Sequence, residues 1–190
     1  AMIVHPPSFG MKLKSIDDTE ARSMPGILNV FTINSLPEGI EPQWSDVNAF
    51  PELVAIVGES TWEVMKAKKI LNVEWESVSK GENSLQHEVE FKKLMDRKVE
   101  EADRKDGDPD KAFKEANRVF EKTYNAPFLA HNTMEPMNFF ADVSNDKAEL
   151  VGPIQTPEYL SKTVSAVLGL EEDKISIMMT RMGGGFGRRL

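Results

Sequence analysis

The stretch LVAIVGESTWEVMKAKKILNVEWE, residues 53–76, carries a strand pattern, a helix pattern and a second strand pattern in succession. The continuous apolar run 53–58 predicts a buried strand. Ser60 is followed three residues later by a glutamate, the spacing of a capping box, so we expect a helix over 61–71. Alternation in 72–76 predicts another strand. Strand, helix and strand in this order indicate a crossover unit, in which the two strands run parallel.

The residues before this stretch extend the same domain. Residues 17–26 predict a short helical turn that stops at a Pro-Gly pair, and the β-branched run 27–33 predicts a strand. Residues 34–51 hold three prolines and read as a loop. Trp62 stands near a helix start, where an aromatic side chain usually packs, so we expect it in the core rather than at a ligand. Residues 1–80 are therefore predicted to form a mixed α/β domain.

Residues 81–118 are dense in charges of both signs, which is typical of solvated helices rather than of a binding face. The sequence DGDPD at 106–110 predicts a break between two helices. We interpret 81–118 as a charged helical linker.

The remaining residues, 119–190, are less charged and combine strand and helix signals. Thr156 with Pro157 predicts a helix start, and Gly169 predicts its stop. Three strands are expected in this part, at 120–127, 148–152 and 174–180.

The loop GGGFGRR at 183–189 follows the last of these strands. Glycines let backbone N–H groups converge on an anion, and Arg188 and Arg189 could pair with phosphate oxygens. The loop is neither a P-loop nor a dinucleotide fingerprint, because no Gly-Lys-Ser/Thr follows and Arg188 replaces the third glycine. A ligand-binding loop and a plain flexible turn both fit this pattern.

Two other positions are candidates for chemistry. His131 and Glu135 lie four apart, as on a metal-binding helix face, but without a second histidine a structural role is the better interpretation. Gln155 stands between a predicted strand and a predicted helix, where α/β sheets often bind ligands, although a glutamine in a loop is commonly just solvated.

Composition narrows the possible classes of protein. The 190 residues are 40% hydrophobic and 28% charged, and the net charge of −8 argues against general nucleic-acid binding. Without cysteine the chain itself holds no disulfide, thiolate zinc site or iron–sulfur cluster. No stretch approaches the roughly 20 apolar residues that span a bilayer. Ala1 before Met2 resembles a tag remnant, so a periplasmic and a cytoplasmic location both stay open.

Three motifs together resemble the large subunit of the xanthine oxidase family of molybdenum hydroxylases: AHNTMEPMN (130–138), GPIQTP (152–157) and MGGGFGRR (182–189). The double arginine is most similar to the isoquinoline 1-oxidoreductase beta-subunit branch, also known as an aldehyde dehydrogenase branch. Residues 5–31 and 53–76 resemble the hammerhead domain of that family.

The resemblance implies an α+β fold, with a hammerhead-type α/β domain at 1–80, the linker at 81–118 and the N-terminal part of a molybdopterin-binding domain at 119–190. Gln155 matches the family glutamine that hydrogen-bonds an apical ligand of molybdenum, and Glu135 matches a family glutamate that we interpret as structural. No residue is expected to bind the metal directly. The cofactor-binding residues implied are Gln155, Gly184, Gly185, Phe186, Gly187 and Arg188.

The family reaction, as the resemblance implies it, is hydroxylation of an aldehyde or an N-heterocycle with oxygen from water, at a molybdopterin cofactor in its dinucleotide form. Electrons would pass to a small iron–sulfur partner subunit, and a glutamate downstream of these residues would be the base. Leu190 stands where the purine-oxidising branch has a substrate-orienting glutamate, which disfavours xanthine. We therefore interpret the chain as a fragment of a large subunit and expect it to be inactive alone and without molybdenum, with the loop 183–189 poorly ordered or in a non-native position.

Two other functions remain possible from the residues alone. The first is a free-standing nucleotide- or anion-binding module that uses the glycine loop. The second is an interaction domain with no small ligand, for which no order is expected after Thr180.

Overall fold

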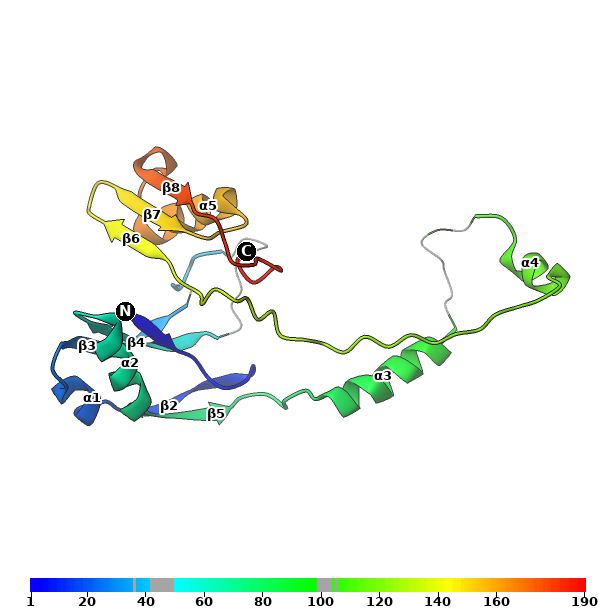
Figure 1. The fold of residues 1–190 in the computed structure, drawn as a ribbon, viewed down its shortest axis with the longest axis horizontal. Helices are drawn as coiled ribbons and strands as arrows, with labels where there is room; N and C mark the ends of the chain where they lie inside the picture. Colours follow the sequence, from blue (N-terminus) through cyan, green and yellow to red (C-terminus); the bar gives the residue numbers. More distant parts are fainter. Residues whose placement is uncertain (36, 42–49, 99–103, 105) are drawn as a thin grey trace. The chain divides into compact units, whose positions relative to one another are not determined.

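The computed structural model describes residues 1–35, 37–41, 50–98, 104 and 106–190. The chain forms two compact units, one made of residues 1–81 and 131–190 and the other of residues 82–130 (Figure 1). Helices and strands are mixed along the chain, which confirms the predicted α+β class.

A three-stranded antiparallel sheet has β4 (Glu52–Gly58) in the middle, between β1 (Met2–Val4) and β3 (Ile27–Asn34). Ile56 pairs with a residue of each neighbour, Met2 on β1 and Val30 on β3. Because β4 has a partner on both edges, its apolar run becomes the buried centre of the sheet, as the sequence predicts.

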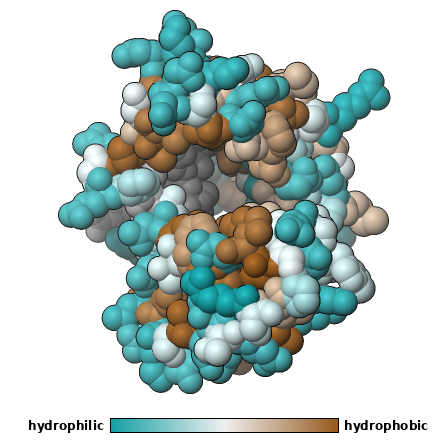
Figure 2. Space-filling model, turned by 90° about the vertical axis from the view of Figure 1, so that its left-hand side faces the viewer, coloured by the Kyte–Doolittle hydropathy of each residue, from teal (hydrophilic) through white to brown (hydrophobic). Residues whose placement is uncertain are grey.

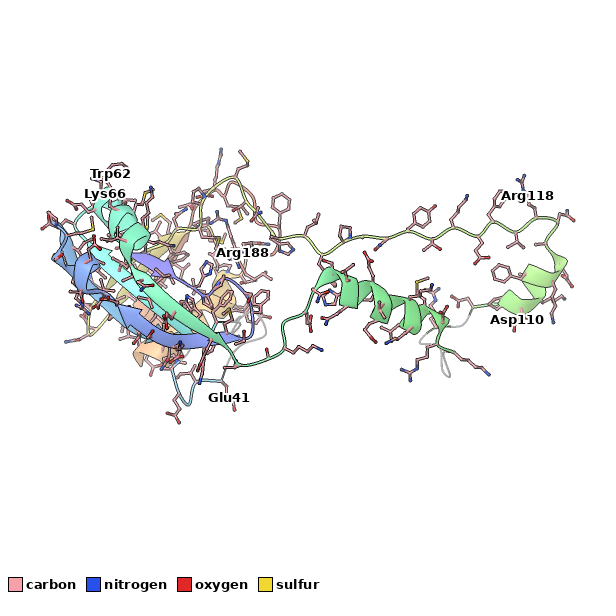
Figure 3. All side chains as sticks on the ribbon, turned by 90° about the horizontal axis from the view of Figure 1, so that it is seen from below. Glu41, Trp62, Lys66, Asp110, Arg118 and Arg188 are labelled. Atoms are coloured by element: carbon pink, nitrogen blue, oxygen red, sulfur yellow. The ribbon has the colours of Figure 1, made fainter. Side chains whose placement is uncertain are left out.

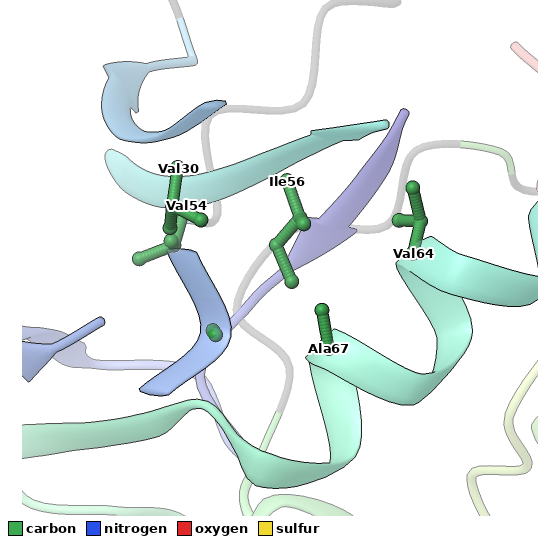
Figure 4. Close-up of a cluster of buried hydrophobic side chains, with 6 residues drawn as sticks. Val30, Val54, Ile56, Val64 and Ala67 are labelled. Atoms are coloured by element: carbon green, nitrogen blue, oxygen red, sulfur yellow. The ribbon is translucent and has the colours of Figure 1, made fainter. Parts of the chain in front are cut away.

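Helix α2 (Thr61–Ile70) begins as predicted at a capped residue. The Ser60 Oγ accepts a hydrogen bond from the Glu63 backbone N–H at 3.3 Å, and the Ser60 hydroxyl donates to the Glu63 carboxylate at 2.8 Å. Val64 and Ala67, three positions apart, share one face of the helix and are buried beside Ile56 (Figure 4).

The expectation that Trp62 packs in the core was wrong, because its side chain points away from the buried face and is 64% exposed. Trp62 and Lys66 project together from α2, with the Lys66 Nζ 4.9 Å from the ring centroid (Figure 3). The core stripe of this short helix is filled by positions 64 and 67, and position 62 falls on the other side.

The predicted crossover unit at 53–76 was also wrong. β5 (Asn72–Ser77) follows α2 but pairs antiparallel with β2 (Met11–Asp17) in a separate two-stranded ladder, not with β4. The short helix α1 (Thr19–Ser23) lies between β2 and β3 and ends before a turn at Gly26, whose φ is +77°. The core that these elements enclose consists of Ala21, Val30, Val54, Ile56, Val64 and Ala67.

The unit 82–130 contains α3 (Ser84–Asp96) and α4 (Pro109–Glu115), and α4 begins within the predicted break at 106–110. Neither helix has a buried residue. Residues 120–127 form no strand, contrary to the sequence prediction. This extended segment pairs with no strand of the described residues, and it leaves Phe120 72% and Tyr124 91% exposed.

The C-terminal sheet has the order β6-β7-β8, with bounds Phe140–Val143, Ala148–Gly152 and Ile175–Met179. β6 and β7 are antiparallel, whereas β7 and β8 are parallel. Helix α5 (Pro157–Leu168) and a 3-10 turn (Glu172–Lys174) connect the two parallel strands. The crossover unit of this protein is therefore β7–α5–β8.

The ends of α5 follow the predicted signals in part. Gly169 has the left-handed φ of +68° that stops the helix, and Pro157 occupies its first turn. Thr156 is the N-cap residue, but its side chain makes no capping hydrogen bond.

Hydrophilic side chains cover most of the face shown in Figure 2, interrupted by hydrophobic patches. Among the described residues, no helix is long and apolar enough to cross a membrane.

Candidate functional site

The two parallel strands of the C-terminal sheet bring Gln155 and the glycine loop together. Gly152 at the end of β7 pairs with Met179 at the end of β8, and the Thr180 N–H donates to the Gly152 carbonyl at 3.1 Å. Gln155 therefore follows β7, and residues 183–189 follow β8, at the same edge of the sheet. The carboxyl edge of parallel strands is the usual ligand position in α/β sheets.

Gln155 contacts this loop through both backbone and side chain. Its Oε1 accepts a hydrogen bond from the Gly187 N–H at 3.1 Å, and its own backbone N–H donates to the Arg189 carbonyl at 2.7 Å. The Nε2 amide group of this exposed side chain has no acceptor among the described residues. The glutamine thus uses its oxygen to hold the loop and keeps two N–H donors available.

The loop backbone has a conformation that depends on its glycines. Gly184 and Gly187 have φ values of +107° and +77°. A Cβ at Gly185 would lie 2.8 Å from the Cδ of Gln155, so only glycine allows this close approach.

Phe186 is the one described non-glycine residue with a positive φ, +50°, and its side chain is 73% exposed. A left-handed aromatic residue with an exposed ring is a costly arrangement that often marks a ligand site. The backbone N–H groups of Gly184, Gly185 and Phe186 have no acceptor among the described residues.

Glu135 holds the start of the loop through hydrogen bonds with Gly183. The Gly183 N–H donates to Glu135 Oε2 at 2.7 Å, and the Glu135 backbone N–H donates to the Gly183 carbonyl at 3.5 Å. The Gly183 N–H, and then the Asn138 side-chain amide and the Arg189 guanidinium, hold the pKa of the Glu135 carboxyl below its usual value. Glu135 is therefore a loop anchor, in agreement with the structural role predicted for it.

The two adjacent arginines of the loop differ in exposure. Arg188 is exposed, and its backbone N–H donates to the Gly185 carbonyl at 2.8 Å (Figure 3). Arg189 is only 2% exposed and contacts Glu135 and the loop instead of solvent. The burial of Arg189 argues against the idea that both arginines pair with phosphate oxygens, and Arg188 is the exposed one of the two.

These contacts give the loop 183–189 a defined path, contrary to the expectation of poor order. The conformational entropy of the glycines opposes order in this loop, and its hydrogen bonds to Glu135 and Gln155 offset that cost. The hydrogen bonds of the loop depend on the pairing of buried Arg189 with Glu135. No local sequence pattern reveals a contact between residues so far apart in the chain.

The His131 ring lies beside this loop, 3.7 Å from where a Cβ on Gly187 would stand. No group of three or more metal-binding side chains occurs among the described residues, and Glu135 is used by the loop.

Comparison with known proteins assigns this architecture to a class. The sequence profile of the molybdopterin cofactor-binding domain matches residues 91–190, which include Gln155 and the whole glycine loop. The chain belongs to this family.

Relatives named as an aldehyde dehydrogenase and an aldehyde oxidase align with almost the whole chain. A membrane-bound aldehyde dehydrogenase [pyrroloquinoline-quinone] of Gluconacetobacter polyoxogenes is 28% identical over 97% of this chain and 23% of its own length. Human aldehyde oxidase is 26% identical over 94% of this chain and 14% of its own length.

Two solved structures share the fold. Quinoline 2-oxidoreductase from Pseudomonas putida 86 superposes with a TM-score of 0.61 at 16% identity, over 98% of this chain and 27% of its own. Aldehyde oxidoreductase from Desulfovibrio gigas gives a TM-score of 0.60 at 19% identity, over 97% and 23%. The chain spans a quarter or less of the length of the curated relatives described here.

Proposed function

We propose that this chain is part of a molybdenum hydroxylase large subunit that oxidises aldehydes or N-heterocycles, and that it supplies one wall of the molybdopterin site. The observation that carries the proposal is the meeting of Gln155 with the loop 183–187 at the carboxyl edge of β7 and β8. The family match and the aldehyde-oxidising names of the relatives support the cofactor and the substrate class.

The donors at this edge suit a cofactor rich in oxygen acceptors. The N–H groups of Gly184, Gly185 and Phe186 and the Nε2 of Gln155 lack acceptors among the described residues. Backbone N–H groups held in a glycine loop form a concave donor surface for anionic or polarised oxygens. The missing Cβ at Gly185 keeps this surface open to close contact.

These residues would bind and orient the cofactor, which, when bound, supplies the two-electron oxidation of a carbon centre. Gln155 and the loop N–H groups of Gly184, Gly185, Phe186 and Gly187 would hold its inner part, although the Gly187 N–H acts here through Gln155. The exposed guanidinium of Arg188 suits the diphosphate of a dinucleotide form. We assign the catalytic base to a glutamate beyond these residues, and the electron route to a small iron–sulfur subunit.

The name of one relative includes pyrroloquinoline quinone. The family match over residues 91–190 instead describes molybdopterin, so we propose molybdopterin as the cofactor here.

The test is metal and pterin analysis of the complete enzyme that carries this sequence, together with oxidation of an aldehyde in the presence of an artificial electron acceptor. We expect about one molybdenum and one pterin per large subunit, since the cofactor carries the chemistry. A protein that binds a nucleotide but contains neither molybdenum nor pterin would support the free-standing nucleotide module instead.

The interaction domain without a small ligand finds no support in the loop. That alternative expects no order after Thr180, whereas the loop 183–189 has defined hydrogen bonds to Glu135 and Gln155.

A further inference from the structure

The guanidinium of Arg189 is buried and connects segments that are far apart in the sequence. Its Nη2 donates to the Glu135 carbonyl at 2.9 Å and pairs with Glu135 Oε2 at 3.2 Å, while its Nε donates to the Gly184 carbonyl at 3.0 Å. None of the side chain is exposed, whereas the Glu135 side chain is 29% exposed. A buried cation needs such a paired anion, because an unpaired charge is strongly disfavoured away from water.

The backbone of the same residue holds the glutamine of the proposed site. The Arg189 carbonyl accepts from the Gln155 backbone N–H at 2.7 Å. Gln155 in turn accepts from the Gly187 N–H through its Oε1. Arg189 thus fixes the start of the loop by its side chain and Gln155 by its backbone.

We propose that Arg189, paired with Glu135, is a positioning residue that sets the distance between the glycine loop and the Gln155 side chain. Arg189 does not contact a ligand in this proposal. It acts by keeping the Gly187 N–H on Gln155 Oε1, so that the Nε2 donors of Gln155 face outward. The consequence for cofactor binding rests on the proposed function, but the positioning itself does not.

The chemistry of the contacts requires arginine. Its planar fork donates to the Gly184 carbonyl from Nε and to Glu135 from Nη2, in two directions at once. A lysine ammonium is a single point charge and can keep the pairing with Glu135 but not the Gly184 contact as well. Methionine keeps much of the length of the side chain and removes both contacts.

The experiment compares Arg189→Lys and Arg189→Met with Arg188→Lys and Arg188→Met in the 190-residue chain without cofactor. Arg188 is the matched control, because it is the adjacent arginine of the same loop and is exposed. Amide hydrogen exchange is measured by NMR at Gly183 and Gly187, with the amides of β4 as reporters of global stability. The Gln155 side-chain NH₂ resonances give a second readout of its hydrogen bond.

We expect exchange at Gly187 to become about tenfold faster in both Arg189 variants relative to the β4 amides, with a shift of the Gln155 NH₂ resonances. Both Arg188 variants are expected to keep the exchange rates and the resonances of the unmodified chain. Equal acceleration at Gly187 and at β4 would show a merely structural role and would overturn the proposal. An unchanged Gly187, or the same effect from Arg188→Met, would overturn it as well.

If Arg189→Met does not fold, Arg189→Lys and Glu135→Gln decide the question. Glu135→Gln keeps an acceptor for the Gly183 N–H and removes the charge that faces Arg189. We expect Gly183 to stay protected and Gly187 to exchange faster than in Arg188→Met. Because no cofactor is involved, a failure here is distinct from absence of molybdenum in the complete enzyme, which would instead refute the proposed function.

Discussion

The two ends of the Gln155 amide differ in their contacts: its oxygen accepts from the Gly187 N–H, and its nitrogen has no acceptor among the described residues. In the proposed function, this nitrogen is the donor to the cofactor. The two halves of the amide can be separated by substitution. A carboxylate at this position still accepts from Gly187 but donates nothing.

In the complete enzyme we therefore expect Gln155→Glu to keep the loop in place and to lower turnover about 100-fold, the usual effect of losing one preorganised donor. Gln155→Ala should lower turnover as well, and neither variant should unfold the protein. Steady-state kinetics and thermal unfolding check this. Unchanged turnover in either variant would mean that the glutamine has another role.

Substitution of Gly185 tests how closely the loop must approach Gln155. A methyl group here would stand 2.8 Å from the Gln155 Cδ, so Gly185→Ala should displace the glutamine and reduce the molybdenum content of the complete enzyme several-fold. Gly81→Ala is the control, because a Cβ at Gly81 meets no atom within 4 Å and Gly81, like Gly185, has no positive φ. Molybdenum analysis that finds equal loading of both variants would contradict the close approach.

The ionisation of Glu135 predicts how the stability contributed by this loop anchor depends on pH. Its pKa in the folded protein lies below the ordinary value of 4.5, because the Gly183 N–H, Asn138 and Arg189 favour the charged form. Its charge therefore stabilises the fold fully above the unfolded pKa, and this contribution disappears as the pH falls through the folded pKa. Denaturant unfolding should show a stability gap between the unmodified chain and Glu135→Gln that is constant near neutral pH and narrows below about pH 4.5. A gap that does not change with pH would argue against the anchor.

At the scale of the helices and strands, sequence patterns predicted the elements better than their pairing. The apolar run of β4, the cap of α2 and the Pro and Gly limits of α5 are local signals, and the structure confirms them. The partner of β5 is not local, since β2 lies some sixty residues earlier in the chain. A bulge between Leu13 and Ser15 also interrupts the alternation of β2 and hides that strand from a period-two search.

Helix α2 allows a direct test of which face is buried. Val64 is 1% exposed and Trp62 is 64% exposed on the same helix. We expect Val64→Ala to lower the free energy of unfolding by about 2 kcal/mol, through lost burial and a small cavity. Trp62→Ala removes a larger side chain but only an exposed cation–π contact with Lys66, so its cost should stay within about 1 kcal/mol. Urea unfolding that reverses this order would contradict the orientation of the helix.

At the scale of the whole molecule, the sequence predicted the α+β class, and the motif resemblance assigned Gln155 and the glycine loop to one cofactor site. The sequence did not predict that Arg188 is exposed and Arg189 is buried. Adjacent residues in an irregular loop have no period from which an inward or outward side can be read. Only the position of Glu135, 54 residues before Arg189, decides which arginine is buried.

Leu190 bears on the substrate preference of the complete enzyme. Leu190 directly follows the loop and is 42% exposed. At this position the purine-oxidising branch of the family that the motifs resemble has a substrate-orienting glutamate. Leucine offers neither charge nor hydrogen bond to a polar purine, whereas it suits the apolar body of an aromatic aldehyde or a simple N-heterocycle. We therefore expect kcat/KM for benzaldehyde or isoquinoline to exceed that for xanthine by about 100-fold, the discrimination that an apolar contact typically gives against a more polar substrate. Leu190→Glu should narrow this ratio by weakening turnover of the apolar substrate, while the molybdenum content stays constant. Comparable rates for xanthine and benzaldehyde in the unmodified enzyme would show that another residue sets the preference.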